Sequence, residues 1–72
     1  MTICLFEFLL EEELLTEGIP GSVVAIYLPE YRQYKVIYYH LSKRFEFEIA
    51  EDYTDFDYCA LVEGIRLAYV CG

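Results

Sequence analysis

Apolar and polar residues alternate most clearly in the segment FEFEI, residues 45–49, where Glu46 and Glu48 separate three apolar side chains. Because successive side chains of a strand point to opposite faces, this pattern predicts a strand with one apolar face and one acidic face. Two β-rich segments precede it, SVVAIYL at residues 22–28 and YKVIYYHL at residues 34–41. Short turn segments separate the three, so the sequence predicts a three-strand antiparallel meander.

The N-terminal apolar segment allows two interpretations. In the first it is a single helix, because apolar residues recur every three or four positions from Ile3 to Leu14 and Gly18 follows as a stop. In the second, residues 3–8 form a strand and residues 9–17 a short helix, which would place three glutamates near a helix N-terminus. We favour the single helix.

A further helix is predicted to begin near residue 55. Thr54 followed three residues later by Asp57 fits the capping-box pattern, and acids in a first turn offset the positive end of the helix dipole. Gly64 leaves two outcomes for the following segment. Either the helix continues past this glycine, or it ends there and residues 65–71 form a last strand. We favour the strand, because the segment is rich in β-branched and aromatic residues.

These elements predict an α+β fold, in which a small antiparallel β-meander of three to four strands packs with one or two short helices. The chain has 72 residues, so we expect a single domain over residues 1–72. Domains of this size bury only about 60% of the surface of the unfolded chain. The hydrophobic fraction of 57% is nevertheless high. Some apolar surface is therefore expected to remain for a partner.

Both faces of the predicted hairpin, residues 22–41, are largely apolar. An antiparallel sheet with one solvated face should instead alternate apolar and polar residues. At most two short helices are available, so there are three alternatives. The helices lie on opposite faces of the sheet, the tyrosine hydroxyls on the open face reach water, or that face contacts a second copy of the chain or another protein. We favour the contact, because tyrosine is enriched at interface hot spots and is frequent here. The tyrosines predicted to bind a partner are Tyr31, Tyr34, Tyr38 and Tyr39.

The formal net charge of −8 is unevenly distributed. Residues 31–45 carry four basic residues and no acid, whereas the rest of the chain carries all thirteen acids and one arginine. Rows of carboxylates about 6.7 Å apart on a strand face would imitate a phosphate backbone; the alternatives are a solvated surface and, for Asp55 and Asp57, a helix start. The acids predicted to bind a partner are Glu46, Glu48, Glu51, Asp52, Asp55 and Asp57.

No signature of catalysis, cofactor binding or metal binding is present. The sequence contains no GxGxxG, GxxxxGK[ST], GxSxG or HExxH motif, and we interpret the single histidine, His40, as structural. Cys4, Cys59 and Cys71 are odd in number and form no CxxC, which argues against a disulfide framework and a zinc site. We expect no catalytic residue, no metal and no cofactor.

The location of the chain is predicted to be cytoplasmic. Its beginning lacks a basic region and Glu7 interrupts the first apolar stretch, so it does not fit a signal peptide. The longest uncharged run, residues 18–29, is too short to span a bilayer.

We therefore expect a small acidic, non-enzymatic protein-interaction module that inhibits a larger nucleic-acid-binding protein through phosphate mimicry. Its partner would have a basic surface, and we expect no direct binding to nucleic acid, whose phosphates need positive charge, and none to a membrane. In size and charge the chain resembles the small acidic inhibitors, of the anti-CRISPR type, that phages carry against host nucleic-acid-binding defence systems. That resemblance implies a viral protein acting as a DNA mimic in the host cytoplasm. The alternative is a homodimeric regulatory or ligand-binding domain of ferredoxin-like type, paired through the hairpin.

Overall fold

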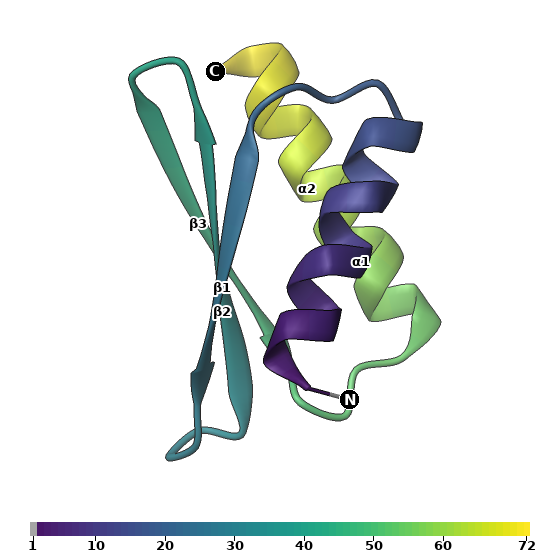
Figure 1. Ribbon diagram of the computed structural model, residues 1–72, viewed down its shortest axis with the longest axis vertical. Coiled ribbons are helices and arrows are strands. Elements are labelled where there is room, and N and C mark those ends of the chain that lie inside the picture. Colours follow the sequence, from purple (N-terminus) through teal and green to yellow (C-terminus); the bar gives the residue numbers. More distant parts are fainter. Residues whose placement is uncertain (1) are drawn as a thin grey trace.

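The computed structural model describes residues 2–72, which form one three-stranded sheet and two helices (Figure 1). The strands lie in the order β1-β2-β3 and each pair is antiparallel. The predicted α+β fold with an antiparallel meander is thus confirmed, with three strands and two helices in the described part of the chain. In chain order the elements are α1 (Ile3–Thr16), β1 (Ser22–Leu28), β2 (Gln33–His40), β3 (Lys43–Ala50) and α2 (Asp55–Cys71).

The N-terminal segment is the single helix α1, as favoured from the sequence. Thr2 caps it, because its side-chain oxygen accepts a hydrogen bond from the Leu5 amide at 3.2 Å. Phe6, Leu10 and Leu14 are buried along one face. A strand over the first part of this segment is wrong, since the three- and four-residue spacing lets a helix bury all three side chains together.

Both helices pack against the same face of the sheet (Figure 1). Helix α1 contacts β1, α2 contacts β3, and the two helices also contact each other. The alternative with one helix on each face is wrong, and so is the ferredoxin-like arrangement, because this chain begins and ends its fold with a helix. The core between the layers contains Phe6, Leu10, Leu14, Ile19, Val23, Tyr34, Val36, Tyr38, Ile49, Leu61, Val62 and Ile65.

Helix α2 begins where the sequence indicated. The Thr54 side-chain oxygen accepts from the Asp57 amide at 3.2 Å, and the Thr54 amide donates to the Asp57 carboxylate at 3.0 Å. These two reciprocal bonds form the predicted capping box and satisfy amides that would otherwise lack a partner.

The predicted last strand over residues 65–71 is wrong, because α2 continues through Gly64 to Cys71. Gly64 is a packing position rather than a stop. A Cβ there would lie 3.1 Å from Cε1 of Phe47, so the missing side chain lets the helix approach β3 closely. Ile65 is fully buried and continues the apolar stripe of the helix. Burial of this stripe outweighs the β propensity of the individual residues.

The strand bounds differ from the predicted ones mainly at the second turn. We predicted a turn over residues 42–44, but Lys43 and Arg44 belong to β3, and His40 pairs directly with Lys43. The two residues between them form the connection, and Leu41 adopts a left-handed conformation with φ +58°. A two-residue hairpin loop commonly needs such a positive φ, so the conformation of Leu41 is compatible with this short turn.

An alkaline titration is expected to show that several tyrosines of this chain ionise above their ordinary range. Burial raises the pKa of Tyr38, Tyr53 and Tyr58 above the usual value of about 10. A tyrosine with a higher pKa in the folded chain than in the unfolded chain binds its proton more tightly when folded. Its contribution to stability is therefore complete below pH ~10 and is lost as the pH rises towards the folded pKa.

Tyrosinate absorbance and far-ultraviolet circular dichroism, recorded on the same samples, check this expectation. The last tyrosines should ionise together with the loss of helix signal, whereas the chain in denaturant should titrate in one step. Complete ionisation of all eight tyrosines near pH 10 with the helix signal intact would contradict it.

Candidate interaction surfaces

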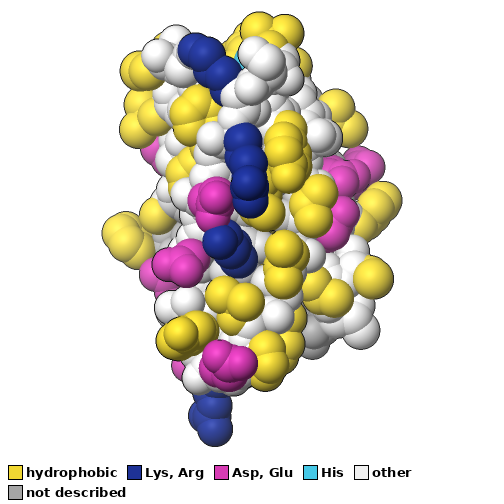
Figure 2. All heavy atoms as spheres, turned by 90° about the vertical axis from the view of Figure 1, so that its left-hand side faces the viewer, with side chains coloured by type: hydrophobic (Ala, Val, Ile, Leu, Met, Phe, Trp, Pro, Cys, Tyr) yellow, Lys and Arg dark blue, Asp and Glu magenta, His cyan; other side chains and the backbone are white. Residues whose placement is uncertain are grey.

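The sheet face that neither helix covers is the first candidate surface, which we call the outer sheet face. Figure 2 shows a column of Lys and Arg side chains running down this side of the molecule, with hydrophobic side chains beside it. Val24 and Ile26 of β1 and Tyr39 of β2 are exposed here, although they are large apolar residues. The premise of the sequence-based argument, an apolar sheet face left open by the helices, therefore holds.

Glu46 lies on the outer sheet face within an ion-pair network. Lys35 Nζ lies 2.6 Å from one oxygen of this carboxylate, and an Arg44 guanidinium nitrogen lies 3.4 Å from the other. The hydrogen bond from Lys35, followed by the charges of Lys35 and Arg44, lowers the pKa of Glu46 below its ordinary value. Its charge is thus offset within the sheet, which makes it a weak phosphate mimic. Glu48, two residues further on β3, has no ion pair with any residue in 2–72.

The four tyrosines predicted to bind a partner divide into two pairs. Tyr34 is 5% exposed and Tyr38 is fully buried, because both lie on the sheet face under the helices. The Tyr34 ring stacks on Phe6 with centroids 4.7 Å apart, and the Tyr38 hydroxyl donates to the Pro20 carbonyl. These two side chains belong to the core and are not offered to a partner. Tyr31 in the first hairpin turn and Tyr39 on the outer sheet face remain exposed.

Most of the negative charge lies on the helical side of the molecule. The only basic residue there, Arg66, pairs with Glu17 and, at 3.2 Å, with Glu63. The sheet and its two hairpin turns hold the other four basic residues and only three acids. We call the ten acids in and beside the two helices the acidic layer: Glu7, Glu11, Glu12, Glu13, Glu17, Glu51, Asp52, Asp55, Asp57 and Glu63.

Four of the predicted partner-binding acids belong to this layer. Glu51 accepts a hydrogen bond from the Tyr27 hydroxyl at 2.7 Å, and this bond is the main reason that the pKa of Tyr27 is raised. Asp57 is engaged in the capping box described above, while Asp52 and Asp55 are exposed beside it. Two of the four are thus occupied by local structure and two are available.

A hollow between the helices brings carboxylates together that the sequence did not connect. Its volume is about 430 Å³, and both helices contribute to its wall. Burial raises the pKa of Tyr58 in this wall, and the negative charge of Glu13 raises it further. No sequence signal places the middle of α1 beside the start of α2, because their contact depends on packing. The lining residues are Leu9, Glu12, Glu13, Thr16, Tyr53, Asp55 and Tyr58.

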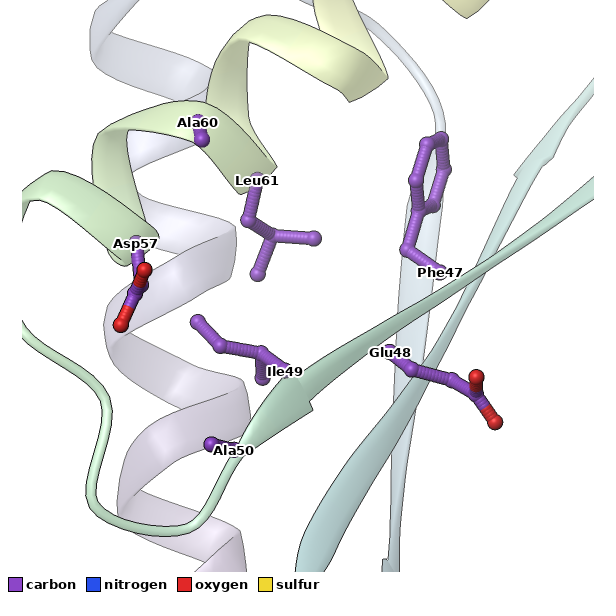
Figure 3. Close-up of a pocket in the computed structure, with 7 residues that line it drawn as sticks. All are labelled: Phe47, Glu48, Ile49, Ala50, Asp57, Ala60 and Leu61. Atoms are coloured by element: carbon purple, nitrogen blue, oxygen red, sulfur yellow. The ribbon is translucent and has the colours of Figure 1, made fainter.

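A second hollow, which we call the β3 groove, lies between β3 and α2 (Figure 3). Its volume is about 350 Å³. Ile49 from the strand and Leu61 from the helix point toward each other across it, while Glu48 points to the opposite side of the strand. The lining residues are Phe47, Glu48, Ile49, Ala50, Asp57, Ala60 and Leu61.

The remaining candidates for chemistry are dispersed. Within residues 2–72 no three His, Cys, Asp or Glu side chains are grouped so that they could hold a metal ion, and the three cysteines are free and exposed. The His40 ring packs edge-on against Tyr69 with centroids 5.2 Å apart. Neither described helix is long and apolar enough to cross a membrane. The chain matches no known family model, no curated protein and no solved structure.

Proposed function

We propose that this chain is a non-enzymatic protein-interaction module, which docks its acidic layer on the basic surface of a larger nucleic-acid-binding protein and inhibits it. The observation that supports the proposal is the segregation of charge, with ten acids and one arginine on the helical side. A surface of one sign orients an approaching partner of the opposite sign and raises the association rate. It also competes with phosphates for the same basic residues.

The geometry favours the helical side over the strand face as the phosphate mimic. On a helix, residues three or four positions apart are neighbours at about 5–6 Å between Cβ atoms. Glu7 and Glu11 are such a pair on α1. Glu12 and Glu13 share the hollow between the helices with Asp55, so carboxylates without an ion pair within residues 2–72 lie close together on this side. On β3, by contrast, Lys35 and Arg44 already offset the charge of Glu46. We therefore place the mimic on the acidic layer.

The test begins with recovery of a partner from host lysate by the tagged chain at low salt, followed by calorimetry with the purified partner. Affinity should fall steeply between low salt and ~0.5 M salt, where exposed charges are strongly screened. Glu12→Lys should weaken binding by about tenfold, because it replaces an attraction by a repulsion of similar size. Glu30→Lys, which makes the same charge change in the first hairpin turn, should leave the affinity unchanged.

Two results would overturn the proposal. One is binding that is equally tight at both salt concentrations and insensitive to Glu12→Lys. The other is a partner whose basic surface still binds nucleic acid while the chain is bound, since mimicry requires the two to exclude each other.

The outer sheet face favours a second candidate, a homodimeric regulatory or ligand-binding domain. Val24, Ile26 and Tyr39 are exposed together on neighbouring strands, and no helix covers them. A dimer held by apolar burial should persist at high salt, whereas docking through carboxylates should not. Sedimentation at both salt concentrations separates the two: a salt-independent dimer that Ile26→Lys converts to a monomer would favour this second candidate.

A further inference from the structure

The two edges of the sheet differ. On the β1 edge, a Glu7 carboxylate oxygen accepts a hydrogen bond from the Ala25 amide at 3.2 Å, so α1 protects the middle of this strand. The β3 edge has no such cover: within residues 2–72 no strand pairs with it on its outer side. Natural proteins commonly protect a sheet edge, because unpaired backbone groups are a template for another strand.

The bond from Ala25 to Glu7 also fixes which backbone groups of β3 point outward. In an antiparallel ladder, alternate residues direct their N–H and C=O groups to opposite sides. The backbone N–H of Ala25 points away from β2, and Ala25 pairs with Val36. The backbone N–H and C=O of Val36 must therefore point toward β3, where Val36 pairs with Phe47. The intervening residues of β3 must direct theirs away from the sheet. These residues are Arg44, Glu46, Glu48 and Ala50.

The β3 groove runs beside this open edge. Its volume of about 350 Å³ lies within the range of roughly 300–1,000 Å³ that is usual for ligand sites. Phe56 and Leu67 lie on the same flank of α2 as Ala60, by helical spacing, and are 80% and 55% exposed. A strand added to β3 would therefore direct one row of its side chains into an apolar space between strand and helix.

We propose that the β3 edge and the β3 groove bind an extended segment of a partner protein by antiparallel strand addition. The segment would have apolar residues at alternate positions, pointing into the groove, and Lys or Arg residues between them on the outer sheet face. Charge complementarity supports this chemistry, because Glu48 lies on the outer sheet face and lacks an ion pair within residues 2–72. The proposal concerns a different surface from the acidic layer and does not rest on the proposed function.

In registers centred on residues 46–48, charge also argues against a second copy of this chain as the occupant. Opposite residues of an antiparallel pair lie on the same face, so a two-fold β3–β3 contact must pair outward-pointing residues with one another. Any such contact centred on residues 46–48 sets Glu46 or Glu48 directly opposite a glutamate of the other copy. Like charges in this position are destabilising. A basic segment instead meets Glu48, which has no ion pair within residues 2–72, with attraction.

The experiment titrates the ¹⁵N-labelled chain with a capped synthetic peptide, Lys-Val-Lys-Val-Lys-Val-Lys. Binding should shift the amide resonances of Glu46, Glu48 and Ala50 and slow their hydrogen exchange, because these N–H groups gain partners. A peptide with the same residues but the valines in one block should bind at least tenfold more weakly. N-methylation of the lysines should abolish binding, and N-methylation of the valines should not, because only the lysine amides face β3.

A variant of the chain tests the groove itself. Ala60→Leu fills the groove and should lower the affinity for the alternating peptide by at least tenfold. Cys59→Leu, on the other flank of α2, should leave that affinity unchanged. Glu12→Lys should also leave the affinity for the peptide unchanged, because Glu12 lies outside the groove. A failure of the acidic-layer proposal can therefore be distinguished from a failure of this one. The proposal is overturned if the block peptide or both N-methylated peptides bind as well as the first. It is overturned too if Ala60→Leu has no effect, or if the β3 amides shift with protein concentration alone, which would identify a second copy as the occupant.

Discussion

Phe6→Ala is expected to lower the free energy of unfolding by about 3–5 kcal/mol. A chain of this length has a total free energy of unfolding of only roughly 4–11 kcal/mol, so the variant should lose a large part of its stability. Phe6 is fully buried and stacks on Tyr34, with centroids 4.7 Å apart. Its ring also contacts Tyr53 and Tyr58, at centroid distances of 5.5 and 6.5 Å. Removing it opens a cavity where α1, β2 and the start of α2 meet.

Urea unfolding followed by circular dichroism measures this loss, and Phe8→Ala supplies the matched control. Phe8 lies two residues further along the same helix but is 56% exposed, so its removal should cost less than about 1 kcal/mol. If the two variants lost the same stability, burial of Phe6 in the core would not be the reason for its effect.

Gly21→Ala is expected to lower the free energy of unfolding by about 3 kcal/mol or more. Gly21 has a φ of +119°, a conformation in which a side chain is strained by about 1–3 kcal/mol. A Cβ there would lie 2.5 Å from the Tyr39 carbonyl oxygen and 2.7 Å from Cε1 of Tyr38. Neither neighbour can move freely, because Tyr39 belongs to the central strand and Tyr38 is fully buried.

Gly18→Ala separates the two causes. Gly18 also has a positive φ, +73°, but no atom lies within 4 Å of the position that a Cβ would take. Only backbone strain remains, and the free energy of unfolding is expected to fall by about 1–2 kcal/mol. The same urea titration compares both variants. An equal loss would mean that close contact at Gly21 contributes nothing, contrary to the geometry.

Local rules were sufficient for much of the fold. Thr54 and Asp57 predicted the start of α2 because a capping box involves only residues of one turn. The alternation in residues 45–49 predicted β3 for the same reason, since each side chain needs only its own strand to set its direction. Gly64 was misread as a stop because its actual role depends on Phe47, which is distant in the sequence.

The candidate surfaces were less predictable. Tyr38 and Tyr39 are adjacent and chemically identical, yet the first is buried and the second exposed. Glu46 and Glu48 likewise looked equivalent, but only Glu46 is paired, because the register with β2 and the neighbouring Arg44 decide which carboxylate meets a cation. The roles of Tyr39, Glu46 and Glu48 in binding stay predictions, as does the partner.

The sequence by itself determined the type and order of most elements and the presence of two apolar faces in the hairpin, because periodicity and caps act over a few residues. Only the tertiary structure decided that both helices share one face, which leaves the outer sheet face open and gathers the acidic layer on the opposite side. It alone decided that Glu7 covers one edge of the sheet while the β3 edge stays open beside a groove. The physical reason is that alternation defines two faces of a strand without saying which is inside. That choice is made when the helices bury one of them.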